Sequence, residues 1–454
     1  LSTDTRRGDG GLPATAMPVR WEVATDAGFR RIVQKGTASA APEMGYSVHV
    51  EVTGLPAHRD FFYRFHTADA TSPVGRSRTA PAAQADVDRL RFAFASCQNY
   101  EHGYYHAHRD LAQQDVDAVL FLGDYIYEYR SKDRPRVHTL PKLVTVDDYR
   151  TCYAQYHSDP DLQAAHAAHP WIVTFDDHEV ENNWAGDIDQ EDDAPAVFLQ
   201  KRAAAFQAYY ENMPLRRSNL PTGPDMTIYR TLPYGKLAQF TVVDTRQFRT
   251  DQPCGDNFKA PCTAQTNPAA TMMGATQEAW FGNALANSPA QWNIVANQVM
   301  IQQLQERRNG ETVFNMDQWD GYPAARKRLT DFLAERKPSN PVVVTGDTHQ
   351  TWVGNLKADF DDPHSAVVGT ELVGTSITSG GDGVAKTQFS DEELANNPHI
   401  VYNNDLRGYF LCEIDAREMR SELRTVNHVT TSDGVVTTSA RFRTEAGRPG
   451  VVTA

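Results

Sequence analysis

The chain has 454 residues, of which 40% are hydrophobic and 10% aromatic, and its formal net charge is -14. These proportions are typical of a globular protein, and the length favours two domains because one hydrophobic core rarely organises so long a chain. The sequence contains no apolar run of the ~18 residues that a membrane-spanning helix needs. Its basic clusters, such as Arg30-Arg31, are short, so we expect no nucleic-acid partner.

Residues 1–80 are predicted to form a small all-β domain. Four segments in it alternate apolar and polar residues and are separated by polar turns, as half-exposed strands do: VRWEVATD, RIVQKGTA, YSVHVEVTGL and DFFYRFHTA. Their span fits a sandwich of the fibronectin or immunoglobulin type. A first strand is hard to find before Val19, which suggests a trimmed start, and the Ala/Pro-rich residues 81–89 are the expected linker.

Residues 90–454 follow a different pattern and are predicted to form an α/β domain with a largely buried sheet. Its predicted strands are LRFAFAS, DAVLFLGD, PWIVTFDD, KLAQFTVVD, WNIVANQ, NPVVVTGD and ELVGTSITSGG. Helical patterns lie between several of them, as in GYYHAHRDLAQQ, FLQKRAAAFQAYYENM and AARKRLTDFLAER.

Polar, ligand-type residues follow many of these strands. The strand ends carry Ser96-Cys97-Gln98, Gly123-Asp124, Asp176-Asp177-His178, Asp244, Asn297-Gln298 and Gly346-Asp347-Thr348-His349. One acid at a strand end is usually a turn residue, but ligands of open α/β sheets bind at the carboxyl ends of the strands, so the set is expected to converge. Carboxylates suit hard ions, imidazole suits transition metals, and thiolate or phenolate suits ferric iron or zinc. The prediction is a metal site in which two ions share Asp124, with Tyr127 on one of them.

Four of these motifs in combination resemble the PhoD-type alkaline phosphatases, a family that includes secreted phospholipases D. The motifs are ASCQ at 95–98, GDYIY at 123–127, DDHEVENN at 176–183 and GDTH at 346–349. The second is similar to the G-D-x-x-Y element of purple-acid-phosphatase-type metallophosphoesterases. The resemblance covers about residues 20–450. It implies a metallophosphoesterase-like sandwich of sheets flanked by helices, preceded by the small β domain.

The resemblance also implies a centre of one Fe3+ with one or more Ca2+ ions. Cys97, Asp124 and Tyr127 are the implied iron ligands, His349 is a further one by analogy, and Asp124 bridges to calcium. The calcium ligands implied are Asp177, Asn183 and Asp347, with their division between ions left open. Taken alone, each residue has an ordinary structural interpretation, such as a buried strand thiol for Cys97.

The activity that the resemblance implies is phosphoester hydrolysis by a metal-activated oxygen nucleophile. His178 is expected to protonate the leaving alkoxide or to orient the phosphate. A cation must also touch the phosphate, and Arg202, on the helix after the Asn pair, is the candidate. A serine hydrolase is disfavoured because no G-x-S-x-G motif occurs, and no phosphate-binding loop of the G-x-x-x-x-G-K-[ST] type occurs either.

Two other functions stay open. A phospholipase D would use the same centre and meet a membrane surface transiently through an apolar collar. Its candidate residues are better interpreted as core: Trp184, Phe248, Phe258, Met272, Met273 and Trp352. Residues 131–149 are a candidate lid, and residues 380–383 either shape the rim or form a flexible loop. Less favoured is a non-catalytic binding protein with a degenerate enzyme domain. No protein partner is implied.

The five cysteines bear on the cellular compartment. Cys254 and Cys262 bracket a polar loop and are predicted to form a disulfide, which implies an oxidising compartment. Cys412 is predicted to be a buried strand residue. With the family resemblance, the disulfide predicts a secreted, extracellular protein whose leader peptide is absent from this chain.

Overall fold

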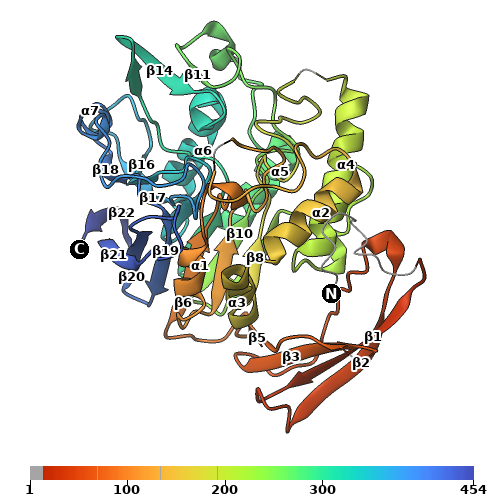
Figure 1. Ribbon diagram of the computed structural model, residues 1–454. Helices are drawn as coiled ribbons and strands as arrows, with labels where there is room; N and C mark the ends of the chain where they lie inside the picture. Colours follow the sequence, from red (N-terminus) through yellow and green to blue (C-terminus); the bar gives the residue numbers. More distant parts are fainter. Residues whose placement is uncertain (1–13, 69, 133, 192) are drawn as a thin grey trace.

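The computed structural model describes residues 14–68, 70–132, 134–191 and 193–454 (Figure 1). At the N-terminus, five strands form one antiparallel sheet in the order β2-β1-β3-β4, with β5 paired to β3. They are β1 (Met17–Ala24), β2 (Ile32–Ala40), β3 (Asp60–Thr67), β4 (Ala70–Thr71) and β5 (Gly75–Arg78), and η1 (Pro42–Met44) follows β2. No second sheet faces this one among the described residues 14–80, so the predicted sandwich is not confirmed.

The segment YSVHVEVTGL is not a strand, which corrects one prediction. Its side chains contact the larger domain instead of forming a ladder. The ring of His49 stacks on Tyr210 with centroids 4.1 Å apart, and its Nδ1 lies 2.8 Å from the carbonyl oxygen of Leu215. Glu51 accepts a hydrogen bond from the backbone of Arg217. An alternating pattern therefore marks a half-buried extended segment here, without the pairing that defines a strand.

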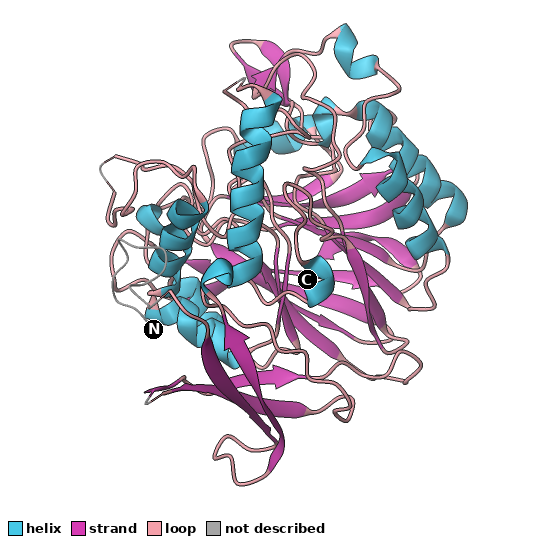
Figure 2. Cartoon of the chain, turned by 90° about the vertical axis from the view of Figure 1, so that its right-hand side faces the viewer, coloured by secondary structure: helices cyan, strands magenta, loops and turns pink. Residues whose placement is uncertain are grey.

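The larger domain contains two seven-stranded sheets, which lie at the centre of the molecule in Figure 2. The first has the order β22-β21-β20-β19-β6-β7-β8, with β6, β7 and β8 parallel. Its strands are β6 (Leu90–Ala95), β7 (Ala118–Phe121), β8 (Trp171–Val173), β19 (Gly408–Ile414), β20 (Glu418–Val426), β21 (Val436–Glu445) and β22 (Arg448–Thr453).

The second sheet has the order β18-β16-β17-β15-β12-β10-β9, in which β10, β12, β15 and β17 are parallel. It comprises β9 (Arg230–Tyr234), β10 (Ala238–Val242), β12 (Trp292–Ala296), β15 (Pro341–Thr345), β16 (Thr351–Lys357), β17 (Val367–Val373) and β18 (Ile400–Asn404). A small third sheet contains β11 (Phe258–Lys259), β13 (Glu306–Arg308) and β14 (Glu311–Asn315). Six of the strands predicted beyond residue 90 are present, and the seventh, ELVGTSITSGG, is a strand only over its first three residues, at the end of β17.

Helices cover the outer faces of the two large sheets (Figures 1 and 2). The helices of the described residues are α1 (His106–Leu111), α2 (Val146–His157), α3 (Pro160–Ala168), α4 (Pro195–Asn212), α5 (Gly274–Ala286), α6 (Pro323–Arg336) and α7 (Ser390–Asn396), of which α7 lies beside the edge strand β18, with short 3-10 turns η2 (Tyr100–His102), η3 (Arg217–Asn219), η4 (Thr263–Thr266) and η5 (Trp319–Gly321). In the described residues, no helix is long and apolar enough to cross a membrane.

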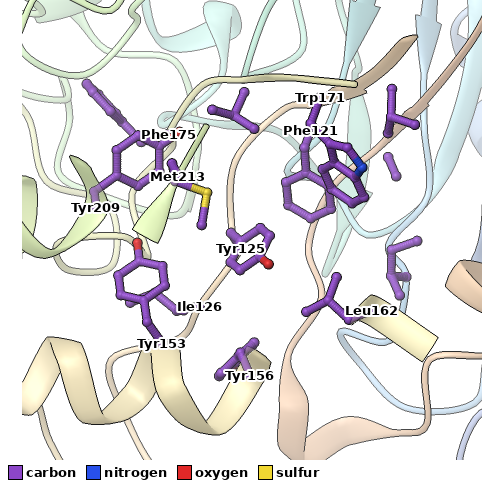
Figure 3. Packing of buried hydrophobic residues seen from close by; sticks show 14 of the residues in the cluster. Phe121, Tyr125, Ile126, Tyr153, Tyr156, Leu162, Trp171, Phe175, Tyr209 and Met213 are labelled. Atoms are coloured by element: carbon purple, nitrogen blue, oxygen red, sulfur yellow. The ribbon is translucent and has the colours of Figure 1, made fainter. Parts of the chain in front are cut away.

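Buried aromatic side chains join these layers. Between the sheets, Phe92 of β6 meets Phe240 of β10 edge to face at 5.4 Å, and within the first sheet Phe94 stacks on Phe410 of the neighbouring strand β19 at 5.0 Å. On the outer face of the β6-β7-β8 sheet, a second cluster packs under α1 to α4 (Figure 3), where Phe121 stacks on Trp171. Such burial is the main stabilising contribution to the fold. The rigid packing holds the parallel strand ends of both sheets against one another.

Candidate metal centre

Most of the predicted ligands stand on strained backbone in the segments that follow the strands. Five of them have φ angles in the left-handed region, which residues other than glycine rarely adopt: Cys97 (61°), Asp124 (56°), Asn183 (53°), Asp347 (63°) and His349 (57°). Each such residue costs about 1–3 kcal/mol, and strain of this kind gathers at functional sites because the surrounding structure imposes it. The strain therefore marks these strand ends as a site.

Close contact between neighbouring strand ends brings the ligands together. The amide of Cys97 donates to the carbonyl of Gly123 at 3.1 Å, and that of Gln98 donates to the carbonyl of Asp124 at 3.0 Å. Gly123 has φ 109°, and a Cβ there would lie 2.4 Å from the Cβ of Asp176. Only glycine fits both the conformation and the space. The sequence Gly-Asp after β7 thus lets the end of β8 approach Asp124.

The first ligand group lies around Asp124 and mixes sulfur, oxygen and nitrogen donors. Ligand atoms of Cys97, Asp124 and His349 lie within 4.8 Å of one another. The hydroxyl of Tyr127 donates to Asp124 Oδ2 at 2.8 Å and lies 3.1 Å from His349 Nε2. It also accepts a hydrogen bond from Ser379. The structure therefore gathers the four residues to which sequence analysis assigned the iron.

Two further groups lie next to the first and share Asp177. Asp124, Asp177 and His178 form one, and Asp176, Asp177 and Asp347 form the other, each again within 4.8 Å. Asp124 belongs to two of the three groups, as a shared ligand must. Its Oδ1 is buried and has no hydrogen-bond partner in the described part of the chain, and the same holds for Asp176 Oδ2. Because buried polar atoms are normally paired, these orphaned oxygens fit a bound cation.

The protonation preferences of these clustered side chains also fit a cation site. Burial and the nearby charge of Asp177 raise the pKa of Asp124 well above its ordinary value, and burial with Asp176 does the same for Asp347. Burial raises the pKa of the Cys97 thiol and the Tyr127 phenol, and lowers that of His349 to about 3. Several neighbouring acids can be ionised together only if positive charge lies close to them. A bound cation supplies that charge and lowers their pKa values again.

Comparison with known proteins agrees with this geometry. The family model described as PhoD-like phosphatase matches residues 92–423, and that of the PhoD-like phosphatase N-terminal domain matches residues 3–81. This chain belongs to the PhoD-like phosphatase family. It is 46% identical over 457 residues to alkaline phosphatase D of Bacillus subtilis (strain 168), an alignment that covers 99% of this chain and 78% of that protein.

A solved structure has the same fold. The structure described as "Structure of PhoD" superposes with a TM-score of 0.97 at 45% identity, over 100% of this chain and 88% of that one. This PhoD-like phosphatase is accordingly a phosphoester hydrolase. The family resemblance drawn from the four motifs is confirmed, and the interpretation as a non-catalytic binding protein is set aside.

His178 lies beside the predicted ligands of the PhoD-like phosphatase, where a residue that transfers a proton would be expected. Its ring stacks on Tyr127 with centroids 4.1 Å apart, and its Nδ1 lies 2.8 Å from Glu128 Oε2. Burial opposes the charge of this imidazole, but the carboxylates of Asp177 and Glu128 raise its pKa well above the ordinary value. A protonated imidazole held at Nδ1 presents its other nitrogen, Nε2, as a proton donor.

Arg202 does not lie at the centre, and the proposed contact with phosphate is not supported. Its guanidinium donates to the carbonyl oxygens of Gly186 and Pro224, at 2.5 and 2.8 Å, and lies 3.2 Å from Asp225 Oδ1. It also lies over the ring of Trp184. The face of α4 that carries Arg202 is buried rather than solvated, so this cation joins two loops.

The cation that the fold does place at the site is Arg246, which sequence analysis missed. Its Nε lies 2.6 Å from Asp176 Oδ1, and its other two nitrogens pair with the carboxylate of Asp317. Its Nη2 lies 3.8 Å from both Asp177 and Asp347. The side chain is completely buried. Its only signal in the sequence was its place two residues after the strand-end Asp244.

Glu179 is a second residue of the site that was not predicted, although it lies within the DDHEVENN motif. Its carboxylate accepts from the backbone amides of Asp124 at 3.1 Å, Tyr125 at 2.5 Å and Asp176 at 2.8 Å. One buried side chain therefore ties the end of β7 to the end of β8 and satisfies three backbone donors that the tight turns leave unpaired.

Two of the predicted strand ends do not supply ligands. Asp244 accepts from the backbone of Arg246 and Gln247, at 2.9 and 3.0 Å, and closes a turn. Asn297 donates to the carbonyl of Val299, and Gln298 bonds Thr245 and Thr174. In these positions the ordinary interpretation of a polar strand end is correct, because the side chains satisfy backbone and hydroxyl groups of the same turns.

The apolar residues considered for a membrane collar are mostly core in this PhoD-like phosphatase. Four are buried: Trp184, Met272, Met273 and Trp352. Phe258 lies under the guanidinium of Arg308, 3.4 Å from its ring centroid. Phe248 is 43% exposed. One exposed phenylalanine does not make a collar.

The two loops singled out by sequence are both held by hydrogen bonds. The candidate lid ends early because α2 begins at Val146, and the buried carboxylate of Glu101 accepts from the backbone of Ser131 and His138 within it. In loop 380–383, the amide of Gly380 donates to His102 Nδ1 at 2.9 Å and Asp382 accepts from the backbone of Val429 at 2.6 Å. The lid role of 131–149 remains a prediction.

The cysteine predictions agree with the structure. Cys254 and Cys262 form a disulfide with their Cα atoms 5.9 Å apart. Cys412 lies fully buried on β19. Cys152 is also a buried free thiol, on α2, with its sulfur 3.8 Å from the carbonyl of Tyr127.

Proposed function

We propose that this phosphoester hydrolase works on a centre of Fe3+ and Ca2+ and that it prefers small phosphate monoesters or diesters to phospholipids. The observation that carries the proposal is the asymmetry around Asp124. On one side lie a thiol, a phenol and an imidazole, and on the other side lie carboxylates, with the imidazole of His178, assigned here to proton transfer, beside them. Donors of the first kind suit ferric iron, and all-oxygen sets suit calcium.

The residues that would hold each ion follow from this division. Cys97, Tyr127 and His349 would hold the iron with one oxygen of Asp124. Asp177, Asn183 and Asp347 would hold calcium, with Asp124 shared. When bound, such ions supply Lewis acidity toward the phosphoryl group.

The chain's own side chains carry the remaining chemistry. Glu128 holds His178 through Nδ1, so that Nε2 can deliver a proton to the oxygen of the leaving group. Arg246 contributes a fixed positive charge among the aspartates, and its contacts with Asp176 and Asp317 keep it from moving. The strained turns hold the ligands in place before substrate arrives, which is the preorganisation that phosphoryl transfer requires.

The preference for small esters is supported by what surrounds the site. A phospholipase D needs an exposed apolar rim to meet a bilayer, and the aromatic and methionine side chains considered for that purpose are largely buried. Export from the cell is also part of the proposal. The Cys254–Cys262 disulfide supports it, because such bonds persist in oxidising compartments.

Two measurements on one preparation test this proposal. The first compares kcat/KM for a phosphate monoester, a small diester and phosphatidylcholine vesicles, in the same calcium-containing buffer without chelator. The second measures iron and calcium per chain in the parent and in Cys97→Ala. We expect the variant to lose iron and activity together, whereas Cys412→Ala, at an equally buried thiol on β19, should keep both.

Each outcome has a defined meaning. Full iron content and activity in Cys97→Ala would show that the iron assignment is wrong. A much higher rate of choline release than of small-ester hydrolysis would replace the preferred substrate class by phospholipids. Two free thiols at positions 254 and 262 in natively isolated protein would remove the support for export.

A further inference from the structure

The disulfide-closed loop of the small third sheet reaches the metal centre through one side chain. Asp256 lies between Cys254 and Cys262, and both of its carboxylate oxygens lie 2.8 Å from Nδ2 of Asn183. Gln190 donates to the same carboxylate. Besides indicating an oxidising compartment, the disulfide therefore closes a loop that contacts a candidate ligand.

The contact fixes which way the Asn183 amide faces. A carboxylate accepts hydrogen bonds and donates none, so the group that meets Asp256 must be the NH2 of the amide. The amide oxygen Oδ1 then points to the opposite side of the group. Calcium is bound by amide oxygen and never by the NH2 group. An Asn183 with a reversed amide would present the wrong atom to a cation.

The rest of Asn183 is held as firmly. Its backbone amide donates to Asp177 Oδ2 at 2.8 Å, and its carbonyl accepts from Gln252 Nε2 at 2.6 Å. Gln252 in turn donates to Asp317, the partner of Arg246. With the backbone held at φ 53°, only the side-chain torsions of Asn183 are left to vary. The hydrogen bonds to Asp256 restrict these torsions.

The loop that carries Asp256 is itself restrained. The disulfide joins residues eight positions apart, and a covalent closure of this kind limits the conformations open to the loop. Within it, the amide of Asn257 donates to Asp256 Oδ1 at 2.6 Å. Cys254 and Asn257 both have left-handed φ angles, 64° and 65°. These restraints keep the carboxylate at one place above Asn183.

We propose that Asp256 is a positioning residue that orients the amide oxygen of Asn183 toward the metal centre, and that the Cys254–Cys262 disulfide holds it there. The proposal rests on the assignment of Asn183 as a calcium ligand in the proposed function. Asp256 acts through Asn183, so its effect must vanish when Asn183 is absent.

A double-mutant cycle on Ca2+ binding tests this. The full chain is freed of calcium, and the Ca2+ concentration that half-saturates the rise in melting temperature is measured for the parent, Asn183→Ala, Asp256→Ala and the double variant. We expect the half-saturating Ca2+ concentration of Asp256→Ala to be at least about 10-fold higher than that of the parent, which is the usual effect of losing a residue that orients a ligand. The double variant should match Asn183→Ala, because coupled residues are not additive.

Three further variants sharpen the test. Asp256→Asn keeps one acceptor for Nδ2 and should recover part of the loss. Asp251→Ala removes an exposed acid whose carboxylate accepts from the Gln252 backbone, and should leave Ca2+ binding as in the parent. Replacing Cys254 and Cys262 with serine should weaken Ca2+ binding in the same direction as Asp256→Ala. Melting temperatures without Ca2+ show whether each variant is folded.

The outcomes separate this inference from the proposed function. If Asn183→Ala weakens Ca2+ binding and Asp256→Ala does not, or if their effects add, the positioning role is wrong and the ligand assignment stands. If Asn183→Ala has no effect, the ligand assignment fails. If the parent shows no Ca2+-dependent shift, the calcium assignment fails. The same cycle in kcat/KM then decides whether Asp256 acts through Asn183.

Discussion

Glu128 Oε2 lies 2.8 Å from Nδ1 of His178, and the other oxygen of Glu128 accepts from the backbone amide of Asn182 at 2.9 Å. Both oxygens of this buried carboxylate are therefore acceptors, one for the imidazole and one for the turn that carries the proposed calcium ligands. This pair links the G-D-x-x-Y element, whose next residue is Glu128, to the DDHEVENN motif.

Replacing Glu128 by glutamine should impair catalysis more than binding. While His178 carries a proton on Nδ1, a glutamine must turn its NH2 toward either His178 or the amide of Asn182, so it cannot keep both hydrogen bonds without removing that proton. We expect kcat for a small phosphate ester to fall by about 10-fold or more, with a smaller change in KM. Steady-state kinetics checks this. Glu191→Gln is the control, because Glu191 is exposed and pairs with Lys142, and a parent-like kcat in Glu128→Gln would remove the role of this contact.

Glu179→Gln should separate the ends of β7 and β8. The variant leaves at least one buried backbone amide facing an NH2 group, which should lower the free energy of unfolding by about 1–3 kcal/mol. Iron and calcium content should fall with it, because the amide cannot accept from all three backbone groups and so holds the turns after β7 and β8 less firmly. Denaturant unfolding and metal analysis check both effects. Glu211→Gln, at a buried carboxylate paired with Arg150, should lower stability without loss of metal.

Gly123→Ala tests the close approach of β7 and β8. The new Cβ would lie 2.4 Å from that of Asp176, at φ 109°. We expect a loss of about 2 kcal/mol or more, since both a steric clash and backbone strain are introduced. Gly54→Ala is the matched control. Gly54 has φ 75° and nothing within 4 Å of the added carbon, so strain alone should cost about 1 kcal/mol. Equal losses at the two positions would show that the clash has no consequence.

Stability in acid should depend on His108. This imidazole is completely buried, its Nε2 lies 2.7 Å from Gln98 Oε1, and burial lowers its pKa to about 3. Between about pH 6.5 and pH 3, the unfolded chain therefore binds a proton that the folded chain does not, and stability falls as the pH falls. The slope from one such proton is about 1.4 kcal/mol per pH unit.

His108→Gln should reduce that slope. Denaturation midpoints of parent and variant are compared between pH 6.5 and pH 4.5 in the presence of chelator, so that loss of metal does not add to the difference. The variant should be less stable at pH 7 because the imidazole packs against Tyr105 and Trp171. The same change at the exposed His364 should retain the parent's slope. Parallel curves for His108→Gln and the parent would contradict the prediction.

Much of the larger domain was predictable from sequence because its signals are local. A buried parallel strand is a short apolar run, and the residue after it stands at a known edge of the sheet. Cys97, Asp124 and Asp347 were found in this way, and all three lie in the cluster. The disulfide followed from two cysteines in one polar loop. The N-terminal strands were largely found too, but an alternating pattern does not reveal whether a segment has a neighbour to pair with, and YSVHVEVTGL has none.

The sequence by itself determined which residue types stand at the strand ends, and with them the family and the kind of chemistry. Only the tertiary structure decided which arginine lies at the site and which additional carboxylates contact it. Arg202 and Arg246 look alike in sequence, yet one joins two loops while the other reaches Asp317, 71 positions away. Asp256 meets Asn183 across 73 positions. Contacts of this kind depend on how distant segments pack, because a side chain's role is set by the atoms that surround it and not by its neighbours along the chain.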